Sequence, residues 1–346
     1  MIQLTYMETK IPMKIGFFEL EGWEEAIIRK VITNQECRFS NDKIEEGKVP
    51  AQTDFDAICI FVDSVINEKT LSYFPKLKFI ATRSTGYDHI DLVACKKRGI
   101  VVSTVPGYGD NTVAEFAFGL LLTMTRKIFD AIDQVKETET LSHKRLRGID
   151  LRGRTILVIG TGRIGTHAIT IARGFDMNVM AYDPMPKPEL ATKLGFPYVS
   201  LEEGLKKADI ITIHCPLNDS TKHLLNKTTM QYVKKGAYLV NTARGGIIET
   251  FALMEALLDG RIAGVALDVL EDEEQTKDEV QFFSKQGAKE EDLKIVLANH
   301  QLMNMPNVFI TPHTAFNTQE ALERILNTTI ENISAFITGN PVHIAL

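Results

Sequence analysis

The chain has 346 residues, of which 44% are hydrophobic and 24% are charged, and its formal net charge at pH 7 is −6. This length predicts about two domains, each able to bury its own core. The composition is that of an ordinary globular protein. An acidic chain without a dense Lys/Arg block argues against nucleic acid or a membrane surface as the main partner.

The cysteines and the absence of targeting signals indicate the compartment. No stretch of about 18 uninterrupted apolar residues is present, so we expect no transmembrane helix. The N-terminus lacks the basic region, apolar run and cleavage site of a signal peptide. Cys37, Cys59, Cys95 and Cys215 are scattered without a C-x-x-C pair, which is typical of free, buried thiols in a reducing compartment. We therefore expect a cytoplasmic protein. A nucleophilic role for Cys215 is the alternative for that one thiol.

Short apolar strands and helical runs alternate through the first third of the chain. Residues 1–11 are expected to form a loose leader. Strands are predicted at 13–18, 57–62, 77–81 and 100–103. This alternation predicts a parallel sheet with helices on both faces.

The stretch from Thr112 to about Lys136 predicts one long helix, which Asn111 would cap. It contains the apolar run 117–122, and its apolar surface is broad. We therefore expect this helix to be buried, with a second subunit as one candidate for the cover.

The most informative motif follows an apolar strand that begins at Thr155. Its six positions are Gly160, Thr161, Gly162, Arg163, Ile164 and Gly165. The first glycine would permit a tight turn, the second would let a pyrophosphate approach the helix N-terminus, and the third would allow close packing. A second strand, 178–182, ends at Asp183, whose carboxylate can accept hydrogen bonds from ribose hydroxyls. Together these features predict a dinucleotide site. A structural glycine turn is the alternative, because the glycine motif alone is weak.

Further strands predict a second doubly wound unit after the motif. They lie at 210–213, 237–240, 264–267 and 308–310, with helical runs between them. Residues 271–292 are rich in acids and lysine and predict a solvated insert, whose role the sequence leaves open. The last helix, about 318–338, has no strand after it and is expected to cross back to the first domain.

Polar residues stand at the predicted carboxyl ends of three of these strands, the edge where open α/β sheets bind ligands. Arg244 follows the first strand, acids at 271–274 follow the next, and His313 follows the last. An arginine can hold a planar carboxylate through two parallel hydrogen bonds. A histidine can exchange a proton with an alcohol or carbonyl near neutrality. A carboxylate beside it would orient the ring and favour imidazolium.

Each of these residues has a simpler explanation on its own: a surface arginine, a hydrogen-bonded turn histidine and a solvated acidic face. Beside a dinucleotide motif, the three together describe hydride transfer to a 2-oxo acid. The chain has no serine nucleophile elbow, Walker loop or H-E-x-x-H pair, so it lacks the motifs of other common chemistries. We expect no metal site.

Over residues 13–338 the sequence resembles the D-isomer-specific 2-hydroxyacid dehydrogenase family. The matching motifs are 158–165, Asn-Thr-Ala-Arg-Gly at 241–245, Leu-Asp at 267–268 with a Glu five residues on, and Thr-Pro-His at 311–313. The resemblance implies that Arg244, Glu273 and His313 are the catalytic residues. Glu271 and Glu274 are the neighbouring acids that would be catalytic if this register were wrong.

The resemblance also implies which residues bind the substrate and NAD. The substrate carboxylate would bind backbone amides of the loop 84–88, at Thr85 and Gly86, and the bulky Tyr108 and Phe316 would surround the substrate. NAD would contact the glycine motif, Asp183 and five further residues: Cys215, Pro216, Thr242, Ala243 and Asp268.

The motif Thr-Pro-His-Thr-Ala-Phe at 311–316 and the long stretch between Glu273 and His313 look most like the D-lactate dehydrogenase branch of the family. Asn317 departs from that branch, which often has Tyr there, and Phe116 stands where many members have His. The preferred substrate side chain is therefore left open.

We predict an α/β protein of two doubly wound parallel-sheet (Rossmann-like) domains with a cleft between them. The substrate domain would be discontinuous, 1–108 plus 316–346, and the NAD-binding domain would be 109–315. The resemblance implies an NAD-dependent D-2-hydroxyacid dehydrogenase, best matched by a homodimeric D-lactate dehydrogenase that reduces pyruvate with NADH. Two alternatives stay open. One is another small 2-oxo acid, such as glyoxylate, hydroxypyruvate or a branched 2-oxo acid. The other is an NAD-responsive, corepressor-like binding protein.

Overall fold

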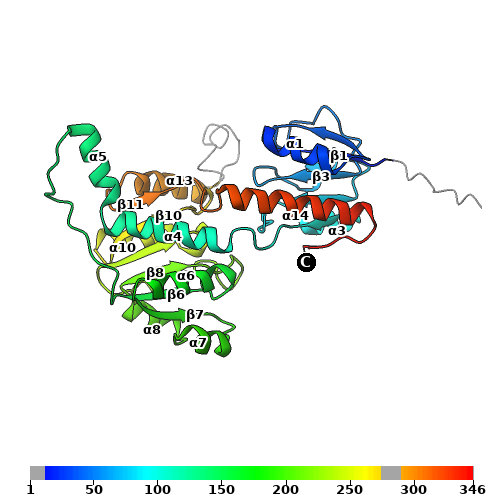
Figure 1. Cartoon of the computed structure of the whole chain (residues 1–346). Coiled ribbons are helices and arrows are strands. Elements are labelled where there is room, and N and C mark those ends of the chain that lie inside the picture. The colour runs from blue at the N-terminus through cyan, green and yellow to red at the C-terminus, as the bar shows by residue number, and fades with distance from the viewer. Residues whose placement is uncertain (1–11, 274–289, 346) are drawn as a thin grey trace, which may run out of the picture. The chain divides into compact units, whose positions relative to one another are not determined.

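The computed structural model describes residues 12–273 and 290–345, which fall into two compact units (Figure 1). The first unit contains residues 1–108 and 318–346, and the second contains residues 109–317. The second unit thus ends at 317, whereas the NAD-binding domain predicted from the sequence ends at 315. The leader 1–11 and most of the acidic insert, 274–289, lie outside the described residues.

The first unit is built on a five-stranded parallel sheet in the order β2-β1-β3-β4-β5. Its strands are β1 Lys14–Phe17, β2 Glu36–Phe39, β3 Ala57–Ile60, β4 Phe79–Thr82 and β5 Val101–Ser103. Its helices are α1 Gly22–Val31, α2 Glu68–Leu71, α3 Leu92–Lys97 and α14 Gln319–Ile337. The rings of Phe336 on α14 and Phe79 on β4 stack with their centroids 4.3 Å apart. The last helix therefore returns to the first unit, as the sequence predicted.

The second unit is built on a six-stranded parallel sheet in the order β11-β10-β9-β8-β6-β7. Its strands are β6 Thr155–Ile159, β7 Asn178–Tyr182, β8 Ile210–Ile213, β9 Ala237–Asn241, β10 Ile262–Leu267 and β11 Val308–Ile310. Its helices are α4 Asp110–Thr125, α5 Ile128–Thr138, α6 Arg163–Gly174, α7 Pro188–Leu194, α8 Leu201–Lys207, α9 Lys227–Met230, η1 Gly245–Ile247, α10 Thr250–Leu258 and α13 Glu290–Met303. The strand order reverses between β6 and β8, and such a switch point is where open α/β sheets bind ligands.

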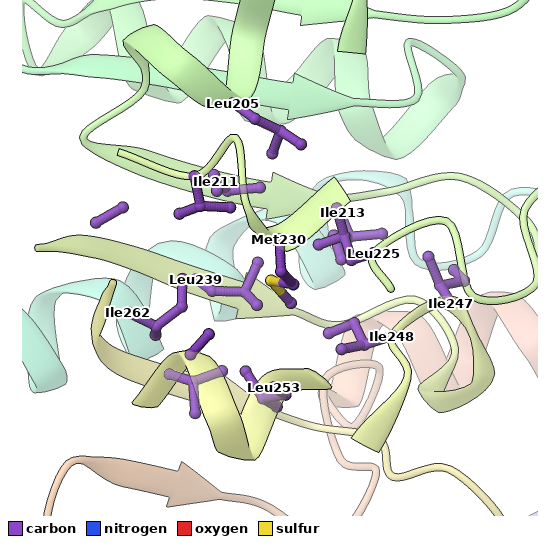
Figure 2. Packing of buried hydrophobic residues seen from close by; sticks show 14 of the residues in the cluster. Leu205, Ile211, Ile213, Leu225, Met230, Leu239, Ile247, Ile248, Leu253 and Ile262 are labelled. Atoms are coloured by element: carbon purple, nitrogen blue, oxygen red, sulfur yellow. The ribbon is translucent and has the colours of Figure 1, made fainter. Parts of the chain in front are cut away.

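The core of the second unit covers both faces of its sheet. Along β6, Leu157 and Ile159 belong to one buried cluster, whereas Ile156 and Val158 belong to another. Alternate residues of a strand point to opposite faces, so both faces are buried, as expected for a parallel sheet. Figure 2 shows the first cluster, in which side chains of the strands pack with those of the helices beside them. The two parallel sheets with their helices confirm the predicted fold class.

The stretch 112–136 forms two helices, α4 and α5, so the prediction of a single helix was wrong. Lys127, between them, has a left-handed φ of 56°. The amide of Ile149 donates to the carbonyl of Thr125 at 3.0 Å, which satisfies the end of α4 from a later segment. No glycine or proline marks this break, which explains why the local sequence did not reveal it.

The start of α4 also differs from the prediction. Gly109 is the residue that precedes the first turn, and the side chain of Asn111 donates to Glu115 at 3.0 Å inside the helix instead of capping it. As expected, α4 is buried along much of its length. In contrast, none of the residues of α5 is buried, and α5 stands away from the sheet (Figure 1).

Candidate functional site

The glycine loop connects β6 to α6 at the switch point of the second sheet. Gly160 has a φ of 93°, and a Cβ there would lie 2.7 Å from the backbone nitrogen of Cys215. A Cβ on Gly165 would lie 2.0 Å from the carbonyl oxygen of Gly160. These two glycines are therefore required by the protein's own packing, at the positive φ and at the close approach of helix and loop.

Gly162 differs from its two neighbours in the motif. It is exposed, it precedes the first turn of α6, and a Cβ there would meet no atom within 4 Å among the described residues. The fold itself leaves room for a side chain at this position. A bare backbone at the N-terminus of a 12-residue helix therefore fits the approach of a pyrophosphate, which the helix amides would stabilise. Next to it, Arg163 Nε donates to Asp110 Oδ2 at 2.7 Å.

Asp183 lies at the end of β7 and is tied to the glycine loop. Its Oδ2 accepts from the Thr161 amide at 2.7 Å and hydroxyl at 2.8 Å, and its Oδ1 accepts from the Met185 amide at 2.9 Å. Burial acts to raise the pKa of this carboxyl, but these hydrogen bonds outweigh it, so the net pKa lies below its usual value. Asp183 is therefore an anion at neutral pH, suited to accept from a ribose hydroxyl and to repel a phosphate.

Four further predicted cofactor residues lie at the ends of β8 and β9. The hydroxyl of Thr242 is buried and has no hydrogen-bond partner within the described part of the chain. A buried hydroxyl without a partner costs free energy, so this position fits a bound ligand, whereas the neighbouring Ala243 amide is already bonded to Asn241 Oδ1 at 3.0 Å. Cys215 is buried, which raises the pKa of its thiol to about 11. That value disfavours the alternative of a nucleophilic thiolate. Pro216, the next residue, is exposed.

The three predicted catalytic residues follow neighbouring strands of the same sheet edge. Arg244 follows β9, Glu273 follows β10 and His313 follows β11. Glu273 Oε2 lies 3.4 Å from His313 Nδ1, within ion-pair reach although long for a hydrogen bond. This contact leaves Nε2 as the ring nitrogen that can face a substrate. Arg244 Nη1 donates to the Ala243 carbonyl at 2.8 Å.

Asp268 holds the turn that carries His313. It is almost fully buried and accepts from the Thr311 hydroxyl at 2.6 Å and from the amides of Thr314 and Ala315 at 2.9 Å each. Burial raises the pKa of the Asp268 carboxyl, and these hydrogen bonds only partly offset that effect. His313 has a left-handed φ of 54°, a conformation that residues with a β-carbon keep only when their surroundings hold it. The resemblance implies a cofactor contact for Asp268, and its carboxylate accepts these three hydrogen bonds from the His313 turn.

The acids after β10 have different partners. Glu271 is bonded to His223 and Thr250, whereas Glu273 faces His313. Glu274 lies outside the described residues. His223 is a functional candidate that the sequence did not indicate, since it is a single histidine in the polar run 218–223 and carries no motif.

Two predicted substrate residues of the first unit, Thr85 and Gly86, lie on the loop that follows β4. The Thr85 hydroxyl donates to the Val105 carbonyl at 2.6 Å, and the Ser84 hydroxyl donates to the Gly86 carbonyl at 2.6 Å. Within the described part of the chain, the amides of Thr85 and Gly86 donate no hydrogen bond, so both are available to an anion. Before the loop, Arg83 forms a buried ion pair with Glu24.

The two bulky residues predicted near the substrate belong to different units. Tyr108 is the last residue of its segment of the first unit, and its carbonyl accepts from Arg324 Nε at 2.7 Å. Phe316 lies in the second unit, three residues after His313. Both side chains are partly exposed.

The described residues contain no group of three or more His, Cys, Asp or Glu side chains arranged to hold a metal ion. In the same residues, no helix combines the length and apolarity needed to cross a membrane.

Comparison with known proteins gives a consistent picture. Residues 118–315 match the model of the D-isomer specific 2-hydroxyacid dehydrogenase, NAD binding domain. A 2-hydroxyacid dehydrogenase homolog of Zymomonas mobilis is 36% identical over 96% of this chain and 100% of its own length. The glyoxylate reductase of Thermococcus litoralis is 33% identical over 96% of this chain and 91% of its own. The structure of D-lactate dehydrogenase from Aquifex aeolicus, complexed with NAD and lactic acid, has a TM-score of 0.82 and 33% identity. It covers 95% of this chain and 99% of that chain.

Proposed function

Because the chain belongs to the D-isomer-specific 2-hydroxyacid dehydrogenase family, and is thus an NAD-dependent oxidoreductase acting on a CH–OH group, we propose that it reduces pyruvate to D-lactate. The observation that carries the proposal is the pairing of His313 Nδ1 with Glu273 at 3.4 Å, on the sheet edge that also bears Arg244 and the glycine loop. This arrangement can supply a proton, an anion to support the proton donor and a cation for a carboxylate.

The proposed mechanism assigns one task to each side chain. When bound, NADH supplies the hydride that reduces the C2 carbonyl. His313 protonates the developing alkoxide from Nε2, and Glu273 at Nδ1 orients the ring and stabilises imidazolium. Arg244 binds the oxo acid and polarises its carbonyl. Asp268 keeps the His313 turn in its left-handed conformation through the three hydrogen bonds described above.

We assign cofactor binding to the second unit and backbone binding of the substrate carboxylate to the first. Gly162 and the first turn of α6 would receive the pyrophosphate, Asp183 the adenosine ribose, and Thr242 another polar group of the dinucleotide. The amides of Thr85 and Gly86 would bind the substrate carboxylate. Both amides are available for it, which supports this assignment.

Two observations favour pyruvate among the small 2-oxo acids. Tyr108 and Phe316 are bulky, and the resemblance puts both near the substrate, which favours a short side chain. The similar Aquifex aeolicus enzyme was solved with lactic acid. The runner-up is glyoxylate, since a glyoxylate reductase is equally identical to this chain at 33%. A methylene group changes specificity by only about 1–3 kcal/mol, so some promiscuity is expected.

The test is a panel of 2-oxo acids assayed by NADH oxidation. Pyruvate should have the highest kcat/KM against glyoxylate, hydroxypyruvate and a branched 2-oxo acid. The lactate formed should be oxidised by a D-specific lactate assay and ignored by an L-specific one. A higher kcat/KM for another 2-oxo acid would discard the lactate assignment and keep the mechanism. Tight NADH binding without turnover of any acid would favour a corepressor-like sensor.

We also propose that the protein is a homodimer whose interface contains α5. The apolar side chains Ile128, Phe129, Ile132 and Val135 are between 42% and 58% exposed, although their spacing gives α5 an apolar face. Of these, Phe129 has a ring contact with Phe309 at 6.5 Å. A second copy of the chain, related by a twofold axis, covers this face in the proposed dimer. Light scattering should give a dimer for the wild type and a monomer for Ile132→Asp; an Ile132→Asp dimer would contradict the assignment.

The proposed location is a reducing compartment such as the cytoplasm. The four cysteines are all free, and three of them are buried. Fractionation of the source cells would test this proposal.

A further inference from the structure

The carboxylate of Glu271 joins three segments of the second unit. Its side chain is only 10% exposed. Oε1 lies 2.5 Å from His223 Nε2, and Oε2 accepts from the amide of Thr250 at 3.0 Å and from its hydroxyl at 2.7 Å. The backbone carbonyl of Glu271 also accepts from Asn299 Nδ2 at 2.9 Å. With three donors on it, this carboxylate is occupied by structural contacts.

The loop of Glu271 and the residue His223 both contact the segment that follows Arg244. A Cβ on Gly245 would lie 1.9 Å from the carbonyl carbon of Leu270 and 2.3 Å from the nitrogen of Glu271. The backbone at 270–271 thus rests directly against Gly245. His223, held by Glu271, donates its own amide to the carbonyl of Gly246 at 2.8 Å. Thr250 begins α10, immediately after this segment.

The geometry around His223 indicates that the contact is held firmly. Its φ is 50°, a left-handed conformation that a residue with a β-carbon keeps only where its surroundings over-determine it. The carbonyl of His223 accepts from Asn226 Nδ2 at 2.9 Å. Its ring is 36% exposed, so it reaches from the surface to the buried carboxylate.

We propose that Glu271 and His223 are positioning residues that fix the loop of Glu273 against the segment that follows Arg244. This inference rests on the proposed function, since it takes Arg244, Glu273 and His313 as the catalytic residues. A buried carboxylate costs free energy unless it is fully hydrogen-bonded, and a fully bonded one fixes the groups around it. Glu273 lies two residues further along the same loop, 3.4 Å from His313. A small displacement of this loop would therefore move Glu273 out of ion-pair distance of His313.

The test compares Glu271→Ala and His223→Ala with the wild type. Both variants should lower kcat about 10- to 100-fold, the loss expected when a catalytic group is slightly misplaced. Both should also move the alkaline limit of the pH–rate profile to lower pH, because His313 loses the support of Glu273. The Kd for NADH, measured by fluorescence, should change by less than about twofold, since the glycine loop follows β6 and is not part of this contact.

A matched control is Glu255→Ala, which removes an exposed acid from α10. Glu255 pairs with Lys227 at 3.1 Å on an exposed surface, and exposed pairs contribute little. This variant should keep the wild-type kcat and pH limit. Glu271→Gln should restore much of the activity that Glu271→Ala loses, because an amide oxygen can still accept from Thr250.

Two results would overturn the inference. One is a folded His223→Ala protein with wild-type kcat and pH limit; because this ring is partly exposed, the variant is informative even if Glu271→Ala does not fold. The other is an additive loss of kcat in the double variant of Glu271→Ala and His223→Ala. Removing both partners of one contact should lower kcat no more than removing one of them. All rates use the 2-oxo acid that the wild type turns over best. A failure with pyruvate would therefore overturn the lactate assignment and leave this test intact.

Discussion

His214 makes the folded protein sensitive to acid. Its ring is buried at the end of β8, with Nε2 at 2.9 Å from the Thr212 hydroxyl and Nδ1 without a hydrogen-bond partner among the described residues. Burial lowers the pKa of this imidazole from 6.5 to about 4, because the charged ring would lose its hydration. His214 is therefore neutral in the folded protein at neutral pH.

Unfolding exposes the ring and returns its pKa to about 6.5. Below that pH the unfolded chain binds a proton that the folded chain does not, so the free energy of unfolding falls as the pH falls. The contribution of neutral His214 to the free energy of unfolding is complete above about pH 6.5 and is lost progressively down to about pH 4. Since one pKa unit corresponds to about 1.4 kcal/mol, the loss is roughly 2 kcal/mol between pH 7 and pH 5.

The assay is urea unfolding of the wild type and His214→Gln at about pH 7 and about pH 5. Glutamine keeps a polar end that can reach Thr212 but does not titrate. The wild type should lose roughly 2 kcal/mol more than the variant over this interval. Taking the difference between the two proteins removes the contribution of every other titrating group. Equal losses in the two proteins would refute the reasoning.

Four further predictions concern the site. His313→Gln should keep NADH binding and lower turnover by about 10²–10⁴; near wild-type steady-state rates would remove its proton role. Glu273→Gln should shift the alkaline limit of reduction to lower pH, and an unchanged pH–rate profile would argue against the pair. Gly162→Ala should weaken NADH binding in fluorescence titrations at unchanged stability, whereas Gly165→Ala should lower the free energy of unfolding by about 1–3 kcal/mol in urea; the reverse pattern would contradict the roles of the two glycines. Because Asp183 is an anion, kcat/KM should strongly favour NADH over NADPH, and equal values would sink this claim.

The features that could be predicted from the sequence are those with a local signal. The glycine motif needs only the strand before it and the helix after it, so its position between β6 and α6 was predictable. The apolar strands of both sheets were predictable for the same reason, because both faces of a parallel sheet are buried. The edge strand β2 was missed, since its residues 36–39 alternate between exposed and partly buried positions and carry no apolar run.

The features that could not be predicted depend on contacts between distant residues. The break between α4 and α5 coincides with a hydrogen bond from Ile149, far along the chain. The bonds from Asp268 to the His313 turn span more than 40 residues. His223 has no motif of its own, and only its meeting with Glu271, 48 residues later, gives it a role.

The order of the strands explains why two acids two residues apart have different tasks. β10 lies between β9 and β11 in the sheet, and neighbouring strands are about 4.8 Å apart. The loop after β10 therefore lies between the loop that bears Arg244 and the loop that bears His313. Glu271 reaches toward the β9 side, where Gly245 and Thr250 lie, and Glu273 reaches toward His313 on the β11 side. A one-residue shift of this loop would break both the contacts of Glu271 and the contact of Glu273 with His313, because neither carboxylate would then occupy the place of the other. The spacing of Glu271 and Glu273 from the end of β10 is thus as much a part of the site as the carboxylates themselves.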